Sequence, residues 1–144
     1  MLFRLAIPDD AQALLRLNAA FNGVDIITEA EVRHSLLSSP ETVVVAEVAG
    51  EVVGFCCAQV HHSFCYPAPV AEVTEMYVDI THRRQGLALG MLRFLEKHLQ
   101  TTLDVDKIHL LTGTSNLAAQ SVYTRAGFTA KNEVYMTKEV PRKR

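Results

Sequence analysis

Residues 76–90 read MYVDITHRRQGLALG, a strand pattern that passes through a turn at Gly86 directly into a helix pattern. The first amides of a helix have no partners within the helix, and the helix dipole is positive at that end. Gly86 and Ala88 are small enough for a diphosphate to approach the backbone, and Arg83 and Arg84 add donors beside it. The segment therefore predicts an anion site. An ordinary strand-to-helix turn with two solvated arginines is the competing interpretation.

Two common nucleotide-binding loops do not fit this chain. A Walker A loop needs Gly-Lys-Ser/Thr, which the sequence lacks, and a dinucleotide fingerprint needs three spaced glycines after the first strand. The loop here has only Gly86 and Gly90, and both come late in the chain. ATP and NAD are therefore disfavoured as ligands.

A second informative segment covers residues 114–128, TSNLAAQSVYTRAGF. Asn116 is a favourable N-cap for a helix, Ala119 and Tyr123 share one helical face, and Gly127 is a typical stop. Taken alone, Tyr123 is equally well explained as a half-buried core aromatic.

Together the two segments resemble the GNAT superfamily of acetyl-CoA-dependent N-acetyltransferases. The first is similar to the family's pyrophosphate loop, Arg/Gln-x-x-Gly-x-Gly/Ala, here Arg83-x-x-Gly86-x-Ala88. The second resembles the helix that follows the family's fifth strand, with Asn116, Tyr123 and Gly127-Phe128 in order. The resemblance covers about residues 70–139; the first 69 residues agree only in the order of their elements.

Hydrophobic periodicity gives an alternating set of strands and helices. We expect strands at 2–7, 42–48, 52–62, 70–80, 108–111 and 133–139, with Ala49-Gly50-Glu51 as the turn of a hairpin. We expect helices from an N-cap at Asp9 or Asp10 to Gly23, from Thr28, in a capping box with Glu31, to Pro40, at 86–100 and at 116–125. The order β-α-α-β-β-β-α-β-α-β predicts a mixed α/β sheet with helices on its faces. The resemblance implies the GNAT fold, a mostly antiparallel sheet flanked by about four helices, as a single domain over residues 1–144.

The resemblance also implies roles for the cofactor site. The exposed backbone of Met76 and Val78 would pair with the pantetheine arm of acetyl-CoA, and Arg83 would lie near the pyrophosphate. Asn116 would contact the cofactor or the acceptor, and Tyr123 would protonate the leaving thiolate as general acid. The amides that would hold the pyrophosphate are those of Arg84, Gln85, Gly86, Leu87, Ala88 and Leu89.

The transfer step benefits from a general base, because the acceptor amine is mostly protonated at neutral pH and must be neutral to attack the thioester. Glu75 and Glu72 are the candidates, with Glu75 favoured, and a solvated strand carboxylate is the alternative for either. Regular alternation puts Glu75 and Tyr77 on one face, opposite Met76, and a bulge would change that phase. We expect direct transfer in a ternary complex without an acyl-cysteine.

The acceptor is an amine whose identity the sequence leaves open. In this family its pocket is built partly by the turn between the first two helices and the loop at 63–69. Asp25 and Glu29, with Glu72, would suit a cationic amine, whereas Phe64 and Tyr66 would suit a flatter substrate. Helix caps and packed loop aromatics explain these residues equally well. Two alternative functions stay open. One is acetylation of a protein lysine or N-terminus, and the other is that of a regulatory module that binds CoA without turnover.

Composition excludes several other classes. With 14 Lys+Arg against 16 Asp+Glu, the chain has no basic excess for nucleic acid, and the basic tail at 141–144 is short. No apolar run approaches the roughly 20 residues that span a bilayer. His61, His62 and Cys65 lack a second ligand pair for a metal, and three cysteines make a poor disulfide framework. We therefore expect a cytoplasmic protein without a metal. Its open sheet edges would support a homodimer.

Overall fold

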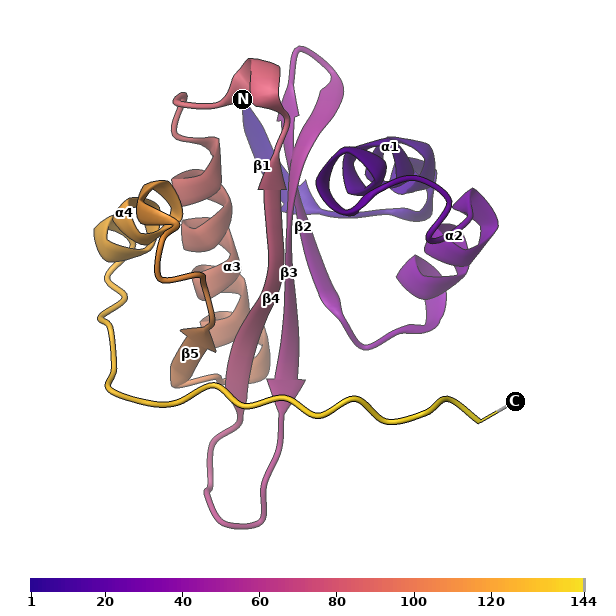
Figure 1. Ribbon diagram of the computed structural model, residues 1–144. Helices are drawn as coiled ribbons and strands as arrows, with labels where there is room; N and C mark the ends of the chain where they lie inside the picture. Colours follow the sequence, from indigo (N-terminus) through magenta and orange to yellow (C-terminus); the bar gives the residue numbers. More distant parts are fainter. Residues whose placement is uncertain (144) are drawn as a thin grey trace.

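The computed structural model describes residues 1–143, which form a sheet with helices on both faces (Figure 1). Arg144, the last residue of the basic tail, lies outside the described residues. The sheet has the order β1-β2-β3-β4-β5; its strands are β1 (Leu2–Leu5), β2 (Thr42–Val48), β3 (Glu51–His61), β4 (Val70–Val78) and β5 (Lys107–Leu110). The first three pairings are antiparallel and the pairing of β4 with β5 is parallel. This is the predicted mixed, mostly antiparallel sheet.

The β2–β3 hairpin follows from its two-residue turn. Ala49 and Gly50 both have positive φ, 51° and 81°, as a type I′ turn requires. The turn twists in the same sense as the strands it joins, so the valine-rich pair of strands predicted from the sequence closes without a longer loop.

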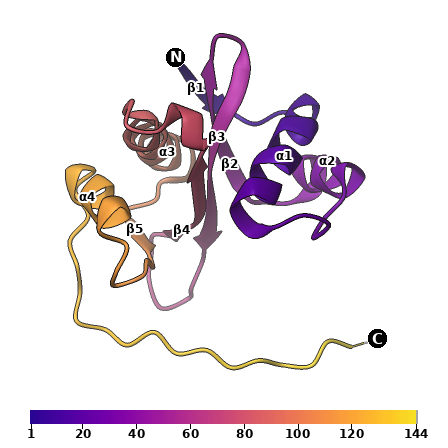
Figure 2. The same cartoon turned by 45° about the horizontal axis from the view of Figure 1, so that its top comes forward.

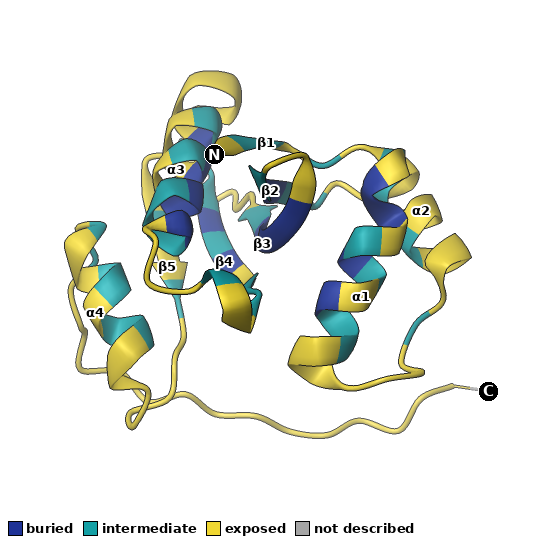
Figure 3. Ribbon diagram, turned by 90° about the horizontal axis from the view of Figure 1, so that it is seen from above, coloured by how far each residue is buried: buried dark blue, intermediate teal, exposed yellow. Residues whose placement is uncertain are grey.

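Over residues 1–143, four α-helices cover the sheet, as predicted. They are α1 (Ala11–Asn22), α2 (Glu29–Ser38), α3 (Leu87–Leu103) and α4 (Leu117–Arg125). In Figures 1 and 2, α1 and α2 lie on one side of the sheet and α3 and α4 on the other. Figure 3 shows the buried positions of α1 and α3. The two faces therefore make two separate cores.

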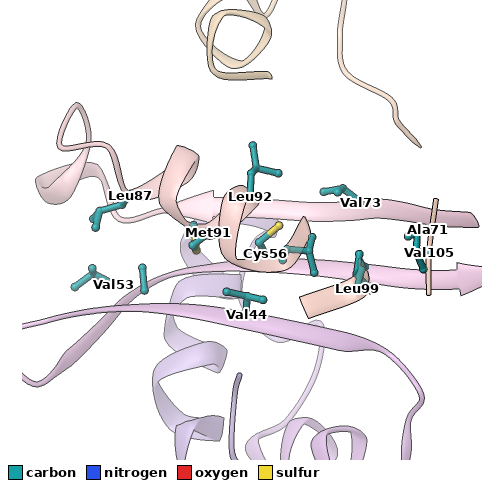
Figure 4. Close-up of a cluster of buried hydrophobic side chains, with 13 residues drawn as sticks. Val44, Val53, Cys56, Ala71, Val73, Leu87, Met91, Leu92, Leu99 and Val105 are labelled. Carbon is teal, nitrogen blue, oxygen red and sulfur yellow. The ribbon is translucent and has the colours of Figure 1, made fainter. Parts of the chain in front are cut away.

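The larger core lies between the sheet and α3. Figure 4 shows Met91 and Leu92 of α3 beside Val44, Cys56 and Val73 of the sheet, all of them buried. The smaller core packs buried residues of α1 against Val45, Phe55 and Cys57 on the opposite face. Hydrophobic burial on both faces holds the sheet rigid, so its strand ends are fixed in space.

The helix starts partly match the sequence. Thr28 and Glu31 form the predicted capping box: the Glu31 amide donates to Thr28 Oγ1 (3.2 Å) and the Thr28 amide donates to Glu31 Oε2 (2.8 Å). Asp10 precedes α1, but its carboxylate does not cap that helix; it accepts from the Ile7 amide (2.8 Å) and from Arg4 instead. The expected N-cap there was wrong because a 3-10 turn over Pro8–Asp10 already precedes α1, so the Asp10 carboxylate caps that turn at Ile7 and pairs with Arg4.

Strand β4 carries a bulge and then separates from β5. Glu75 lies opposite Cys57 and Val73 lies opposite Ala58, so one additional residue, Thr74, lies between two consecutive positions of β3. Pairing with β5 ends at Val73 and Leu110. Among residues 1–143, no strand pairs with the rest of β4 on its β5 side, which leaves an open wedge between the two strands.

The final strand expected at 133–139 is not formed. Residues 129–143 run as an exposed, extended segment away from α4 (Figures 1 and 2). We call these residues the C-terminal segment. The sequence pattern indicates a preference for strand, but a strand also needs a partner strand, and within residues 1–143 this one has none.

Of the helices described, none has the length and apolarity needed to span a bilayer.

Candidate active site

The upper half of β4 presents unpaired backbone groups to the wedge. The Asp79 amide donates to the Val53 carbonyl (2.8 Å), so Val53 and Asp79 form a hydrogen-bonded pair. Because such pairs alternate along an antiparallel ladder, the backbone groups of Tyr77 and Glu75 also point to β3. The backbone groups of Met76 and Val78 point the other way, into the wedge. An amide-containing ligand can therefore pair with β4 as an added strand.

The turn from β4 into α3 leaves a run of amides free. A short 3-10 turn, Ile80–His82, follows Asp79, and the chain then takes positive φ at Arg84 (63°) and Gly86 (80°) before α3 begins. Within residues 1–143, the amides from Arg84 to Leu89 donate to no acceptor; Gly90 makes the first helical bond, to the Gly86 carbonyl (3.0 Å). Such a loop at a helix start is a positively polarised cradle for an anion.

Gly86 keeps that cradle open. A Cβ placed on Gly86 would meet nothing within 4 Å and would project into open space, and the positive φ disfavours any other residue. Gly90 has a different role: a Cβ there would clash with the ring of Phe3 on β1. The surface beside the first glycine is therefore open, whereas the second glycine is required for packing against Phe3. The cradle fits the pyrophosphate expected from the sequence.

The two arginines of the loop differ. Arg83 Nε donates to the Val78 carbonyl (3.0 Å), and its guanidinium lies 5.4 Å from the centroid of the Tyr77 ring. Arg83 thus closes the end of β4 and occupies one of the carbonyls predicted for the pantetheine arm, which leaves the Val78 amide and Met76 for a ligand. Arg84 and Gln85 are exposed at the rim of the cradle.

Tyr123 lies on α4 beside the wedge. Its ring packs edge-to-face on Phe128, with centroids 6.0 Å apart, and borders the larger core that contains Cys56 and Met76. Burial, and then the nearby Cys56, raises the pKa of Tyr123 above its ordinary 10.0. The phenol therefore stays protonated at neutral pH and is able to donate a proton.

Asn116 has the capping role expected from the sequence. Its side-chain oxygen accepts from the Ala119 amide (3.2 Å), which fixes the start of α4 and thereby the position of Tyr123. A contact of Asn116 with the cofactor or acceptor stays a prediction.

The bulge brings the two candidate bases onto one face of the sheet. Glu75 lies opposite Cys57 and Glu72 lies opposite Gln59, and alternate residues of β3 point to the same face. Glu75 and Tyr77 share the side of α1, as alternation predicts, and Glu72 joins them only because Thr74 is inserted. In a regular strand Glu72 and Glu75 would point in opposite directions.

Three further residues on this face, Glu41, His61 and His109, were not selected as acetyl-transfer residues from the sequence. Glu41, just before β2, is half-buried; desolvation and the neighbouring charge of Glu75 raise its pKa. His61 Nε2 lies 3.4 Å from Glu72 Oε2, and the His61 and His109 rings are 6.5 Å apart. Glu41 precedes β2, His61 ends β3 and His109 lies on β5, so only a known strand register could have revealed that they share this face. Within residues 1–143, no three His, Cys, Asp or Glu side chains are placed to hold a metal ion.

The predicted acceptor residues fall into separate places. Asp25 and Glu29 line one hollow of about 590 Å³ between α1 and the loop to α2. Tyr66 is 70% exposed in the β3–β4 loop at the far end of the sheet (Figure 1). Glu72 lies on the sheet face with Glu75. Asp25 and Glu29 therefore line the same hollow, and Glu72 lies on the same face of the sheet as Glu75. The four predicted acceptor residues, Asp25, Glu29, Glu72 and Tyr66, do not line one pocket together.

Comparison with known proteins agrees with this geometry. A family model described as the acetyltransferase (GNAT) family matches residues 12–128. No curated protein matches the chain at a significant level.

Similar solved structures share the fold at low identity. The ribosomal-protein-alanine N-acetyltransferase of Brucella melitensis biovar Abortus 2308 has a TM-score of 0.81 and 19% identity, over 96% of this chain and 100% of that one. An aminoglycoside acetyltransferase from an uncultured soil metagenomic sample, in complex with trehalose, has a TM-score of 0.83 and 17% identity, over 98% and 96%. The same enzyme in complex with sisomicin also scores 0.83, at 15% identity, over 98% and 96%.

Proposed function

Because the chain belongs to the GNAT family of acetyltransferases, we propose that it transfers the acetyl group of acetyl-CoA to a primary amine of a small molecule. Transfer is direct, within a ternary complex. The observation that carries the proposal is the continuity of the wedge: the free backbone groups of Met76 and the free Val78 amide lie on the strand that leads into the unpaired amides from Arg84 to Leu89. The pantetheine arm, which would pair with β4 like a strand, and the pyrophosphate therefore have adjoining sites.

Acetyl-CoA supplies an activated thioester, and the chain supplies the proton transfers. Glu75 accepts the proton that the amine loses as its nitrogen bonds to the acetyl carbon. Tyr123 donates its phenolic proton to the sulfur as the carbon–sulfur bond breaks. Burial supports this role for Tyr123, since its raised pKa keeps the proton available at neutral pH. Glu72 is the alternative base.

The charge of the sheet face supports a cationic acceptor. Glu41, Glu72 and Glu75 border the open face beside β4, and Glu41 raises the negative charge of that face further when it ionises. A protonated amine is attracted to such a face before it loses its proton. Asp25 and Glu29 extend the negative lining on the side of α1 and α2.

Two other functions stay open to test. One solved neighbour is a ribosomal-protein-alanine acetyltransferase, and a peptide amine in place of a small molecule would suit an open groove. A module that binds CoA without turnover would share the cradle but not need Tyr123.

We also propose that residues 1–144 form one domain and that the protein is a homodimer. We propose that it acts in the cytoplasm, where its three free cysteines stay reduced.

Two measurements test the proposed function. Calorimetric titration with acetyl-CoA should give binding that CoA competes for; no binding heat at millimolar ligand would overturn the acetyltransferase mechanism and the CoA-binding alternative together. A panel of polyamines, aminoglycosides and alanine- or lysine-terminated peptides, followed by detection of free thiol, then identifies the acceptor. Release with cationic small amines supports the proposal. Release of free thiol with peptides alone favours a protein acetyltransferase. Binding of acetyl-CoA without release of free thiol favours a CoA-binding module without turnover.

A further inference from the structure

The apolar stripe of α1 ends in an aromatic side chain that stays partly in solvent. Leu14, Leu17 and Phe21 recur at helical spacing, and the first two pack on the sheet in the smaller core. Leu17 is fully buried and Leu14 nearly so, but Phe21, in the last turn of the helix, is 40% exposed. The stripe therefore continues beyond the part of the sheet that it covers, and its last ring has apolar area available for a ligand.

Phe21 belongs to a cluster of three aromatic rings. Its ring stacks on that of Tyr77, with centroids 5.2 Å apart and 27° between the planes, and meets Phe55 edge-to-face at 6.2 Å. The Tyr77 ring also lies 5.4 Å from the guanidinium of Arg83. Because its partners are fixed on β3 and β4, Phe21 is held in one orientation, and its exposed part forms a preformed aromatic surface.

The direction of α1 places this aromatic surface next to Glu75. Arg16 of α1 reaches Asp79 (3.3 Å), whereas Phe21, further along the helix, reaches Tyr77. The helix therefore runs against the direction of β4, and it ends just after Phe21, before the level of Glu75. Tyr77 and Glu75 are alternate residues on this face of the sheet, about 7 Å apart along the strand. Glu75 is accordingly exposed beside the rings.

We propose that Phe21 and Tyr77 select the acceptor, and that the preferred acceptor is a primary amine joined by a short linker to an aromatic ring. The ammonium group then faces the carboxylate of Glu75 while the ring lies on Phe21, so charge complementarity and apolar burial act on the two ends of one small molecule. Phenethylamine is a simple compound of this class. Polyamines and aminoglycosides satisfy the carboxylate but offer no aromatic ring to Phe21.

This selection rests on the proposed function, which places the amine beside Glu75, and it narrows the class of acceptor. The other aromatic candidates from the sequence, Phe64 and Tyr66, lie elsewhere. Both are exposed in the loop that leads into the first residue of β4, whereas Tyr77 is close to the last residue of that strand. Phe64 therefore provides a control position for Phe21.

Chemical-shift titrations of the CoA-bound protein with phenethylamine and with ethylamine test the aromatic surface without turnover. Ethylamine is the same compound without its ring. The wild type should bind phenethylamine about tenfold or more tightly than ethylamine, which is the discrimination that apolar contacts typically give. Phe21→Ala should bring the ratio of the two Kd values close to one, and Phe21→Leu, which keeps apolar contact with Tyr77, should retain part of it. Phe64→Ala should leave the ratio unchanged.

Equal affinities of the wild type for the two amines would overturn the proposal, as would a ratio that survives in both Phe21 variants or is lost in Phe64→Ala. Detection of free thiol with acetyl-CoA in place of CoA separates this result from the proposed function. Selective binding of phenethylamine without release of thiol contradicts acetyl transfer but not the aromatic surface. Release of thiol at the same kcat/KM for both amines contradicts the aromatic selection and leaves acetyl transfer in place.

Discussion

At the scale of single residues, Tyr123 combines a packing role with a proposed chemical one. The sequence supports a core aromatic as well as an acid. The ring packs on Phe128 and burial raises the pKa of the hydroxyl, which supports the proposed acid role and leaves it a prediction. A partly buried phenol beside an open wedge retains its proton over the pH range in which an amine substrate becomes neutral.

Replacing Tyr123 by Phe should lower kcat by about 10²- to 10⁴-fold, the usual contribution of a general acid, and leave the Kd for acetyl-CoA nearly unchanged. The ring and its packing stay in place, so only the proton donor is lost. Steady-state kinetics and calorimetry measure the two effects. In the wild type, kcat should not decline on the alkaline side below pH 10.0, since the pKa of Tyr123 lies above that value. An unchanged kcat in the variant would remove the assigned role.

Glu75→Gln and Glu72→Gln form a matched pair for the base. If Glu75 accepts the amine proton, its replacement should lower kcat/KM at neutral pH, and the activity should recover as pH rises because the amine then loses its proton to water. Glu72→Gln should alter KM more than the pH profile, since Glu72 is occupied by His61 (3.4 Å). Reversed pH profiles for the two variants would assign the base to Glu72.

At the scale of elements, the β4–α3 connection contains two glycines with separate tasks. Gly86→Ala should weaken acetyl-CoA binding, because the new methyl group projects into the cradle, with a stability cost of about 1 kcal/mol for its left-handed φ. Calorimetry with acetyl-CoA measures the first effect and urea denaturation the second. An unchanged Kd would exclude the cradle as the pyrophosphate site.

Gly90→Ala should instead destabilise the protein by roughly 1–3 kcal/mol through overpacking against Phe3. Since the clash is with one ring, the double variant Phe3→Leu with Gly90→Ala should regain part of the loss relative to the two single changes. Urea denaturation of all four proteins gives the coupling. Additive losses would show that α3 shifts away from β1 instead of meeting the ring.

At the scale of the whole molecule, Arg4 joins the first strand to the rest of the fold. It binds Glu47 of β2 and Asp10 at the start of α1. Burial alone would raise the pKa of Asp10, but hydrogen bonds from Arg4 and the Ile7 amide outweigh it and hold that pKa below its ordinary 3.8. The stabilisation is therefore present above pH 3.8 and is lost as pH falls through the lower, folded-state value.

Asp10→Asn should accordingly lower Tm at neutral pH and flatten the dependence of Tm on pH in the acid range. Thermal unfolding from neutral pH down to below pH 3.8 measures both effects. Arg33, which only approaches the exposed Asp9 (3.5 Å), offers the control: Arg33→Gln should change neither quantity appreciably. Equal effects of the two substitutions would contradict a special role for the Arg4–Asp10 pair.

Most of the fold was predictable because its signals are local. The hairpin turn at Ala49-Gly50, the capping box at Thr28 and the stop at Gly127 depend on neighbouring residues, and all three appear at or beside the expected positions. The final strand at 133–139 failed for the opposite reason. Its propensity is local, but its formation requires another strand.

The sequence by itself determined the strand–turn–helix cradle around Gly86 and the capped helix that carries Tyr123, because hydrogen-bonding geometry near a helix end depends on a few adjacent residues. Only the tertiary structure decided which side chains share a surface. The bulge at Thr74 turns Glu72 to the same face as Glu75, whereas strand pairing places His109 opposite Glu72 and the start of β2 places Glu41 near Glu75. The physical reason is the two-residue period of a strand: one inserted residue reverses every side chain beyond it.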